Sequence, residues 1–72
     1  MVFFVNKNPW ANPHRNHEVH KTGWCVVGNL VPLDQRKDLG EQPSAMAAVT
    51  FAKQYYADAD GCAICCPEAH HE

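Results

Sequence analysis

Short apolar runs, each ended by Pro, Gly or Asn, alternate with polar stretches along this chain. Val2 to Lys7 is rich in β-branched and aromatic residues and predicts a strand. A second short strand is expected over His14 to His20, and a brief third over Lys37 to Gly40, ended by its glycine. Val26 to Leu33 is apolar but broken by Gly and Pro, so it predicts a loop with buried anchors.

The clearest helix is predicted for Ser44 to Tyr56. Ser44 can cap its N-terminus by accepting a hydrogen bond from an early amide, and the alanine-rich interior contains neither Gly nor Pro. Small and apolar residues recur at helical spacing on one narrow face: Ala45, Ala48, Val49, Ala52 and Tyr56. The prediction is therefore an α+β fold, with one helix packed on a two- or three-stranded sheet and a zinc-knuckle-like turn at the C-terminus.

The length of the chain limits its core. Seventy-two residues predict one small domain spanning 1–72. Chains below roughly 70–80 residues seldom gain more than about 3–5 kcal/mol from a hydrophobic core alone. A covalent or metal staple is therefore expected, and four cysteines and five histidines can supply it.

Charge and hydropathy narrow the class of partner. The formal net charge is −2 and the six basic residues are scattered, which counts against nucleic acid as the main partner. The apolar run at the N-terminus is too short for a signal peptide or a membrane span, so a cytoplasmic protein is expected. In a reducing cytosol, clustered cysteines favour metal over disulfides.

The segment from Asp60 to Pro67 contains the most specific motif, Cys62-Ala-Ile-Cys65. Two thiols at this spacing can turn toward one point, as tetrahedral zinc requires. Gly61 is expected to provide the positive φ of a tight turn, and Pro67 to end any regular element. Zn²⁺ is therefore the predicted cofactor.

Further ligands must come from elsewhere in the chain. Cys25 is the natural third thiol, and His20 can converge with it across a turn at Gly23. The fourth ligand stays open between His20 and the tail residues His70 and Cys66, although adjacent cysteines point in different directions in most backbone conformations. The wider candidate set also contains the other histidines: His14, His17 and His71.

Other uses of the thiols stay open. Cys62 and Cys65 can form a redox disulfide, but such pairs usually begin a helix, whose N-terminus lowers the thiol pKa, whereas this pair follows a helix. Two disulfides would require an oxidising compartment. The chain shows no Ser/His/Asp set, phosphate loop or paired carboxylates that would indicate an ordinary enzyme.

Several short motifs together resemble a group of short, uncharacterised bacterial proteins. They are Val5-Asn-Lys-Asn8, His17-Glu-Val-His20, Cys25, Leu39-Gly40, Ala48-Val49, Ala52-Lys53, Asp60-Gly-Cys-Ala-Ile-Cys65 and His70. That group also has cysteines at the positions of Ala45 and Ala69. This chain has alanine at both positions, so the ligand set that still matches the group is Cys25, Cys62 and Cys65 with His20 or His70.

More distantly, the order of strand, cysteine, strand, helix and CxxC is similar to the zinc-binding N-terminal domain of the Ada methyl-transfer repair proteins. That domain has four cysteine ligands, one of them an alkyl acceptor. This chain has a single upstream cysteine and no basic surface, so the activity is not carried over.

Two functions follow as expectations. The first is a structural-zinc module that binds a protein or, as the less favoured alternative, a nucleic acid. The second is a thiol-chemistry protein, which acts as an alkyl acceptor, a redox partner or a metal carrier.

Overall fold

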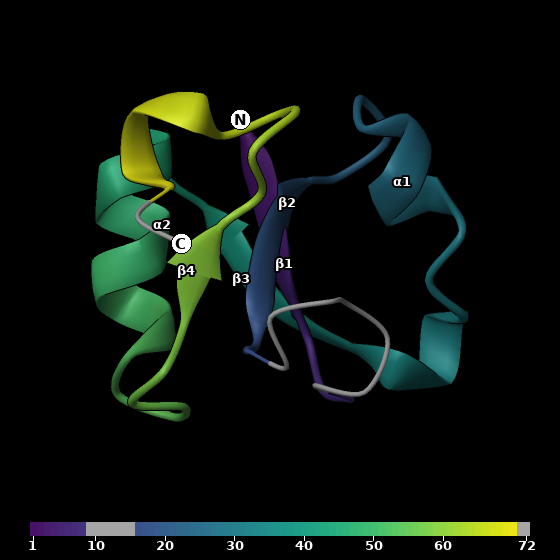
Figure 1. Cartoon of the computed structure of the whole chain (residues 1–72), viewed down its shortest axis with the longest axis horizontal. Helices are drawn as coiled ribbons and strands as arrows, with labels where there is room; N and C mark the ends of the chain where they lie inside the picture. The colour runs from purple at the N-terminus through teal and green to yellow at the C-terminus, as the bar shows by residue number, and fades with distance from the viewer. Residues whose placement is uncertain (9–15, 71–72) are drawn as a thin grey trace.

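The computed structural model describes residues 1–8 and 16–70 and has an open four-stranded mixed sheet with one main helix (Figure 1). The strands are β1 (Val2–Asn6), β2 (Glu18–Lys21), β3 (Arg36–Glu41) and β4 (Asp60–Gly61). The helices are α1 (Val26–Asn29) and α2 (Ala45–Ala52), with 3₁₀ turns at Leu33–Gln35 and Pro67–Ala69. The α+β class is confirmed.

The strand order is β3-β1-β2-β4. β1 pairs antiparallel with β2 and β3, whereas β2 and β4 run parallel. β1 is therefore a central strand, and its residues from Phe3 to Asn6 are all buried. Because side chains alternate along a strand, β1 supplies apolar side chains to both faces of the sheet.

Helix α2 covers one face of this sheet. Ser44 caps it as predicted, since its hydroxyl accepts a hydrogen bond from the Ala47 N–H at 3.1 Å. The core on this face joins strand residues to small helix residues and to the tail: Phe3, Val5, Val19, Leu39, Ala45, Ala48, Val49, Ala52, Ala59, Cys66 and Ala69. The predicted packing of the helix on the sheet through its small-residue face is confirmed.

The helix is shorter than predicted because it ends at Ala52. The N–H groups of Gln54 and Tyr55 bond three residues back, to Phe51 and Ala52, which tightens the chain into a turn. Tyr56 then stacks on His17, with ring centroids 4.0 Å apart. This contact directs the following residues back to the sheet, where Asp60 and Gly61 form a fourth strand. The sheet therefore has more strands than the predicted two or three.

The prediction of a loop with buried anchors from Val26 to Leu33 was wrong. The segment forms helix α1 and begins a 3₁₀ turn, because Cys25 caps α1 through its sulfur. Most of its apolar side chains are exposed; Leu30 and Leu33 are 79% and 80% exposed, and Val31 is the apolar residue of this segment that is buried.

None of the helices formed by the described residues is long and apolar enough to cross a membrane.

Candidate metal centre

The pairing of β2 with β4 brings His20 next to Cys62. Val19 pairs with Gly61 in the parallel register, and the Cys62 N–H donates to the Val19 carbonyl at 3.0 Å. Val19 faces the core under α2. Since successive side chains alternate, His20 and Cys62 both lie on the opposite face of the sheet.

Cys25 reaches the same face through a tight turn. The chain reverses at Gly23, which has a φ of +81°, and Cys25 then begins helix α1. Its Sγ accepts a hydrogen bond from the Gly28 N–H at 3.3 Å. The predicted convergence of His20 and Cys25 across Gly23 is what the structure shows.

The CxxC segment forms a turn in which backbone N–H groups point at sulfur. Cys62 Sγ accepts from the N–H groups of Ile64 and Cys65, and Cys65 Sγ accepts from the Lys21 N–H at 3.4 Å. Each of the three thiols thus has at least one backbone donor. Such donors stabilise a thiolate, which is the form that binds a metal.

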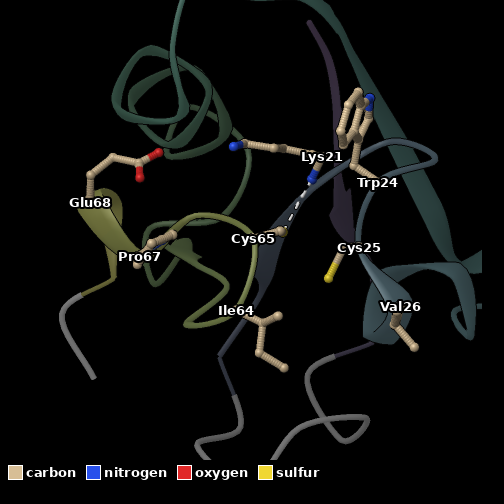
Figure 2. A pocket seen from close by; sticks show the side chains of 8 residues that line it. All are labelled: Lys21, Trp24, Cys25, Val26, Ile64, Cys65, Pro67 and Glu68. Atoms are coloured by element: carbon tan, nitrogen blue, oxygen red, sulfur yellow. Dashed lines mark hydrogen bonds between the residues drawn. The ribbon is translucent and has the colours of Figure 1, made fainter.

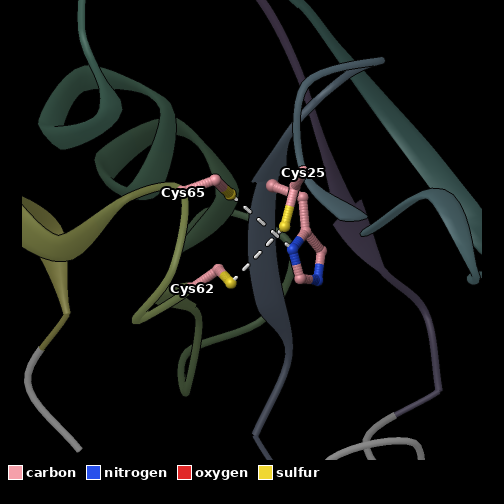
Figure 3. A group of neighbouring side chains, drawn as sticks. Cys25, Cys62 and Cys65 are labelled. Atoms are coloured by element: carbon pink, nitrogen blue, oxygen red, sulfur yellow. Dashed lines mark hydrogen bonds between the residues drawn. The ribbon is translucent and has the colours of Figure 1, made fainter. Parts of the chain in front are cut away.

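Within residues 1–8 and 16–70, the ligand atoms of His20, Cys25, Cys62 and Cys65 all lie within 4.8 Å of one another (Figure 3). The Sγ atoms of Cys25 and Cys62 are 3.8 Å apart, and Cys65 Sγ is 3.9 Å from His20 Nδ1. Tetrahedral zinc with Zn–S bonds of about 2.3 Å would place two sulfurs about 3.8 Å apart. The four side chains can therefore hold one metal ion with little movement.

Burial shifts the pKa values of these groups. Burial, with a smaller contribution from the charge of Arg36, lowers the pKa of His20 to about 4, so the imidazole is neutral at pH 7 and its nitrogen is free to bind. Burial raises the pKa of Cys25 above its usual value. Burial also raises the pKa of Cys62, to about 12. Hydrogen bonding to Cys66 and burial raise the pKa of Cys65. Without a metal the three thiols stay protonated.

Glu18 holds the imidazole from its other side. Its Oε1 lies 3.5 Å from His20 Nε2, while His20 Nδ1 faces Cys65. A carboxylate on the far nitrogen is the usual outer partner of a metal-binding histidine, because it fixes the tautomer and the ring orientation. Because side chains alternate along β2, Glu18 and His20 lie on the same side of the strand, which explains this pairing.

The other candidate ligands have different contacts. His70 Nδ1 lies 2.9 Å from the Gly61 carbonyl oxygen and 3.3 Å from Asp60 Oδ2, so this ring fastens the tail to β4. Cys66 is fully buried in the core under α2, although its sulfur is 3.6 Å from Cys65 Sγ. His17 pairs with Asp58 at 2.5 Å. His14 and His71 lie outside the described residues.

The role of Gly61 differs from the predicted one. Of the four glycines, all within the described residues, only Gly23 and Gly40 have positive φ, so the positive φ predicted for Gly61 was wrong. A Cβ on Gly61 would lie 2.8 Å from the Cys66 carbonyl oxygen and 2.9 Å from Ala69. Gly61 is needed because the tail crosses directly over it.

Gly28 is a site residue that the sequence analysis missed. A Cβ there would lie 2.9 Å from His20 Cβ and 3.2 Å from Cys25 Cβ. The signal was present in the spacing: Cys25-x-x-Gly28 repeats the spacing of Cys62-x-x-Cys65, with glycine in place of the second cysteine. The space that a side chain would need is filled by the imidazole.

A surface pocket of about 350 Å³ opens beside the thiols (Figure 2). Cys25 and Cys65 belong to its lining, and Trp24, Val26 and Ile64 supply apolar walls. Lys21 and Glu68 add one charge of each sign. The candidate metal centre is thus closed by protein on the sheet side and borders a hollow on the other.

No family model, curated protein or solved structure matches the chain. The resemblances drawn from its motifs therefore stay predictions.

Proposed function

We propose that this protein is a structural-zinc module whose metal centre holds an apolar surface in place for a protein partner. The observation that carries the proposal is the grouping of exposed apolar side chains around the thiols. Trp24, Val26 and Ile64 are 73%, 74% and 67% exposed, and all three line the pocket that borders the cluster. Large exposed apolar patches on small proteins mark interaction surfaces.

The donor set supports zinc and a structural role. Three thiolates and one imidazole are a common set for tetrahedral structural zinc, whereas catalytic zinc keeps one position open for water or substrate. The four ligands join three separate parts of the chain: β2, the start of α1 and the turn after β4. The ion would therefore fasten the exposed segments on both sides of the pocket to the sheet.

The remaining features are consistent with this proposal. The four cysteines, all within the described residues, are free thiols, as a reducing compartment would keep them. The low net charge and scattered basic residues favour a protein over a nucleic acid as partner.

Two measurements test the proposal. Native mass spectrometry should find one zinc per chain, lost on chelation. A photo-crosslinking amino acid at Val26 should then give protein adducts in cells, and these should disappear in a Cys62→Ser background. The matched control places the crosslinker at Met46, which is 51% exposed on α2. Equal crosslinking at both positions, or crosslinking that survives zinc loss, would refute the proposal.

Thiol chemistry is the second candidate, because Cys65 is only partly buried and belongs to the lining of the pocket. Alkylation of the zinc-loaded protein distinguishes the two. Rapid, selective modification of Cys65 by iodoacetamide would favour thiol chemistry, whereas protection of all three cluster thiols favours the structural role.

A further inference from the structure

Trp24 and the pocket beside it form a protrusion next to a hollow. The indole is 73% exposed, although tryptophan gains much from burial. The hollow, at about 350 Å³, falls within the range of pockets that hold small ligands, about 300–1,000 Å³. Two-fold symmetric interfaces use one patch on both subunits, so they need a protrusion and a hollow in the same patch.

The pocket lining carries one positive and one negative side chain, so two copies of the pocket can pair their opposite charges. Lys21 and Glu68 are both in its lining, and Figure 2 shows their side chains along the same side of the hollow. In a two-fold arrangement, Lys21 of each copy would face Glu68 of the other. A foreign partner would need a matched pair of charges of its own, whereas a second copy carries it by symmetry.

The exposed apolar area is of the size that a dimer needs. Helix α1 and the segment after it carry further exposed apolar residues outside the pocket lining: Val27, Leu30 and Leu33. With Trp24, Val26 and Ile64 they expose an area on the order of several hundred Å², and each partner in a standard interface buries about 800 Å². The area is large for a chain whose whole accessible surface is 4210 Å².

We propose that the protein partner is a second copy of this chain, in a two-fold symmetric dimer in which each Trp24 fills the pocket of the other copy. This inference rests on the proposed function, because the metal centre positions both the indole and the hollow. The indole of the second copy would cover the open side of Cys65. The dimer thereby completes the protection of the metal centre from solvent.

The first test measures the mass of the zinc-loaded protein by analytical ultracentrifugation over a concentration series. The expected mass is twice the 8.1 kDa of one chain. Trp24→Ala should weaken the dimer roughly thirtyfold or more, as expected for a buried tryptophan anchor. Met46→Ala removes an apolar side chain that is 51% exposed on α2, and it should leave the dimer unchanged.

The second test exchanges charges between copies. Lys21→Glu and Glu68→Lys should each favour the monomer, because each places like charges opposite one another. An equimolar mixture of the two variants should form a heterodimer, which an ion pair within one chain cannot explain. Both variants should keep one zinc, since neither side chain is among the four ligands.

The possible failures are distinct. A zinc-loaded protein that stays monomeric at several hundred micromolar, or a dimer insensitive to Trp24→Ala and to both charge changes, overturns the dimer and leaves the zinc module standing. A dimer without zinc overturns the proposed function instead.

Discussion

His20 is confined on several sides at once. Its ring lies against Phe4, with centroids 5.3 Å apart, Gly28 crosses over its Cβ, and Glu18 faces its outer nitrogen. Only Nδ1 is directed at the thiols. In the folded chain the imidazole therefore presents one nitrogen to the thiols in a fixed orientation.

Gly28→Ala should disturb this arrangement directly. The new methyl would lie 2.9 Å from His20 Cβ, so either the imidazole or helix α1 must move. We expect zinc affinity to fall about ten- to hundredfold, as for other changes that misplace a metal-binding histidine. A chromophoric chelator in competition with the protein measures the affinity.

Gly40→Ala is the matched control for this variant. Gly40 has a φ of +71° and open space around its Cβ position, so alanine there costs about 1–2 kcal/mol of stability through the backbone alone. Because folding and binding are coupled, this cost should weaken zinc affinity by at most about five- to thirtyfold. An effect as large as that of Gly28→Ala would show that general destabilisation, and not His20, explains the loss.

The titration of the cluster predicts the pH dependence of binding. At pH 7 the imidazole is neutral and the three thiols are protonated, so binding one metal should release about three protons. Lowering the pH from 7 to 6 should then weaken the apparent affinity about a thousandfold. Calorimetry in buffers of different ionisation enthalpy counts the protons, and a count near four would indicate a fourth thiolate in place of His20.

The same shifts act on the metal-free fold. The pKa of His20 falls from 6.5 to about 4 on folding, so between these values the unfolded chain binds the extra proton and acid destabilises the fold. The pKa of Cys62 rises from 9.0 to about 12, so above pH 9 the unfolded chain loses its proton first and alkali destabilises the fold. Any metal-free folded protein should be most stable between about pH 6.5 and 9.

At the scale of elements, the contact between α2 and the sheet depends on small residues. Ala48 and Ala52 are fully buried, and the helix lies close to β1 and β2 because neither residue extends beyond a methyl group. Residues of this kind leave no space for a larger side chain in a close-packed interior.

Ala48→Leu or Ala52→Leu should therefore overpack this contact and lower the free energy of unfolding by about 1–3 kcal/mol. Urea denaturation of the zinc-loaded protein measures the change. Thr50→Leu, on the exposed side of the same helix, serves as the control and should stay within about 0.5 kcal/mol. Unchanged stability in both buried variants would mean that α2 can move away from the sheet.

At the scale of the whole molecule, a metal bound by the four side chains would join β2 to the start of α1 and to the turn after β4. One face of the sheet has a continuous core under α2, whereas the other carries Phe4, His20 and the start of α1, whose valines are exposed. Structural zinc contributes apparent binding free energies of about 10–16 kcal/mol near neutral pH. That is as large as the whole stability of a typical domain.

Metal removal should therefore unfold the protein. Chelation, or Cys62→Ser, should abolish dispersed amide signals in NMR spectra and the cooperative thermal transition. Cys66→Ala is the matched control: it removes a thiol from the same segment without burying a hydroxyl in the core, and should keep one zinc and a folded spectrum at a cost of about 1 kcal/mol. A chelated protein with dispersed signals would show that the α2 core is sufficient by itself.

Local interactions allowed the sequence to predict much of this protein. The Ser44 cap and the alanine-rich run determine where α2 begins, since both act within one or two helical turns. Alternation along β2 separates Val19 from Glu18 and His20. The CxxC spacing and the turn at Gly23 predict that thiols and imidazole converge, because short turns restrict where neighbouring side chains can point.

Tertiary structure decided the rest. Whether His20, His70 or Cys66 lies beside the three thiols depends on the parallel register of β2 and β4, which joins segments far apart in the sequence. The same register sends Cys66 into the core and brings the tail across Gly61, where only glycine fits. Tertiary structure also decides the exposure of Val26, Leu30 and Leu33, because α1 packs on His20 through Gly28 and leaves these side chains uncovered. Hydrophobicity alone favours burial, so the sequence does not show which apolar residues stay exposed.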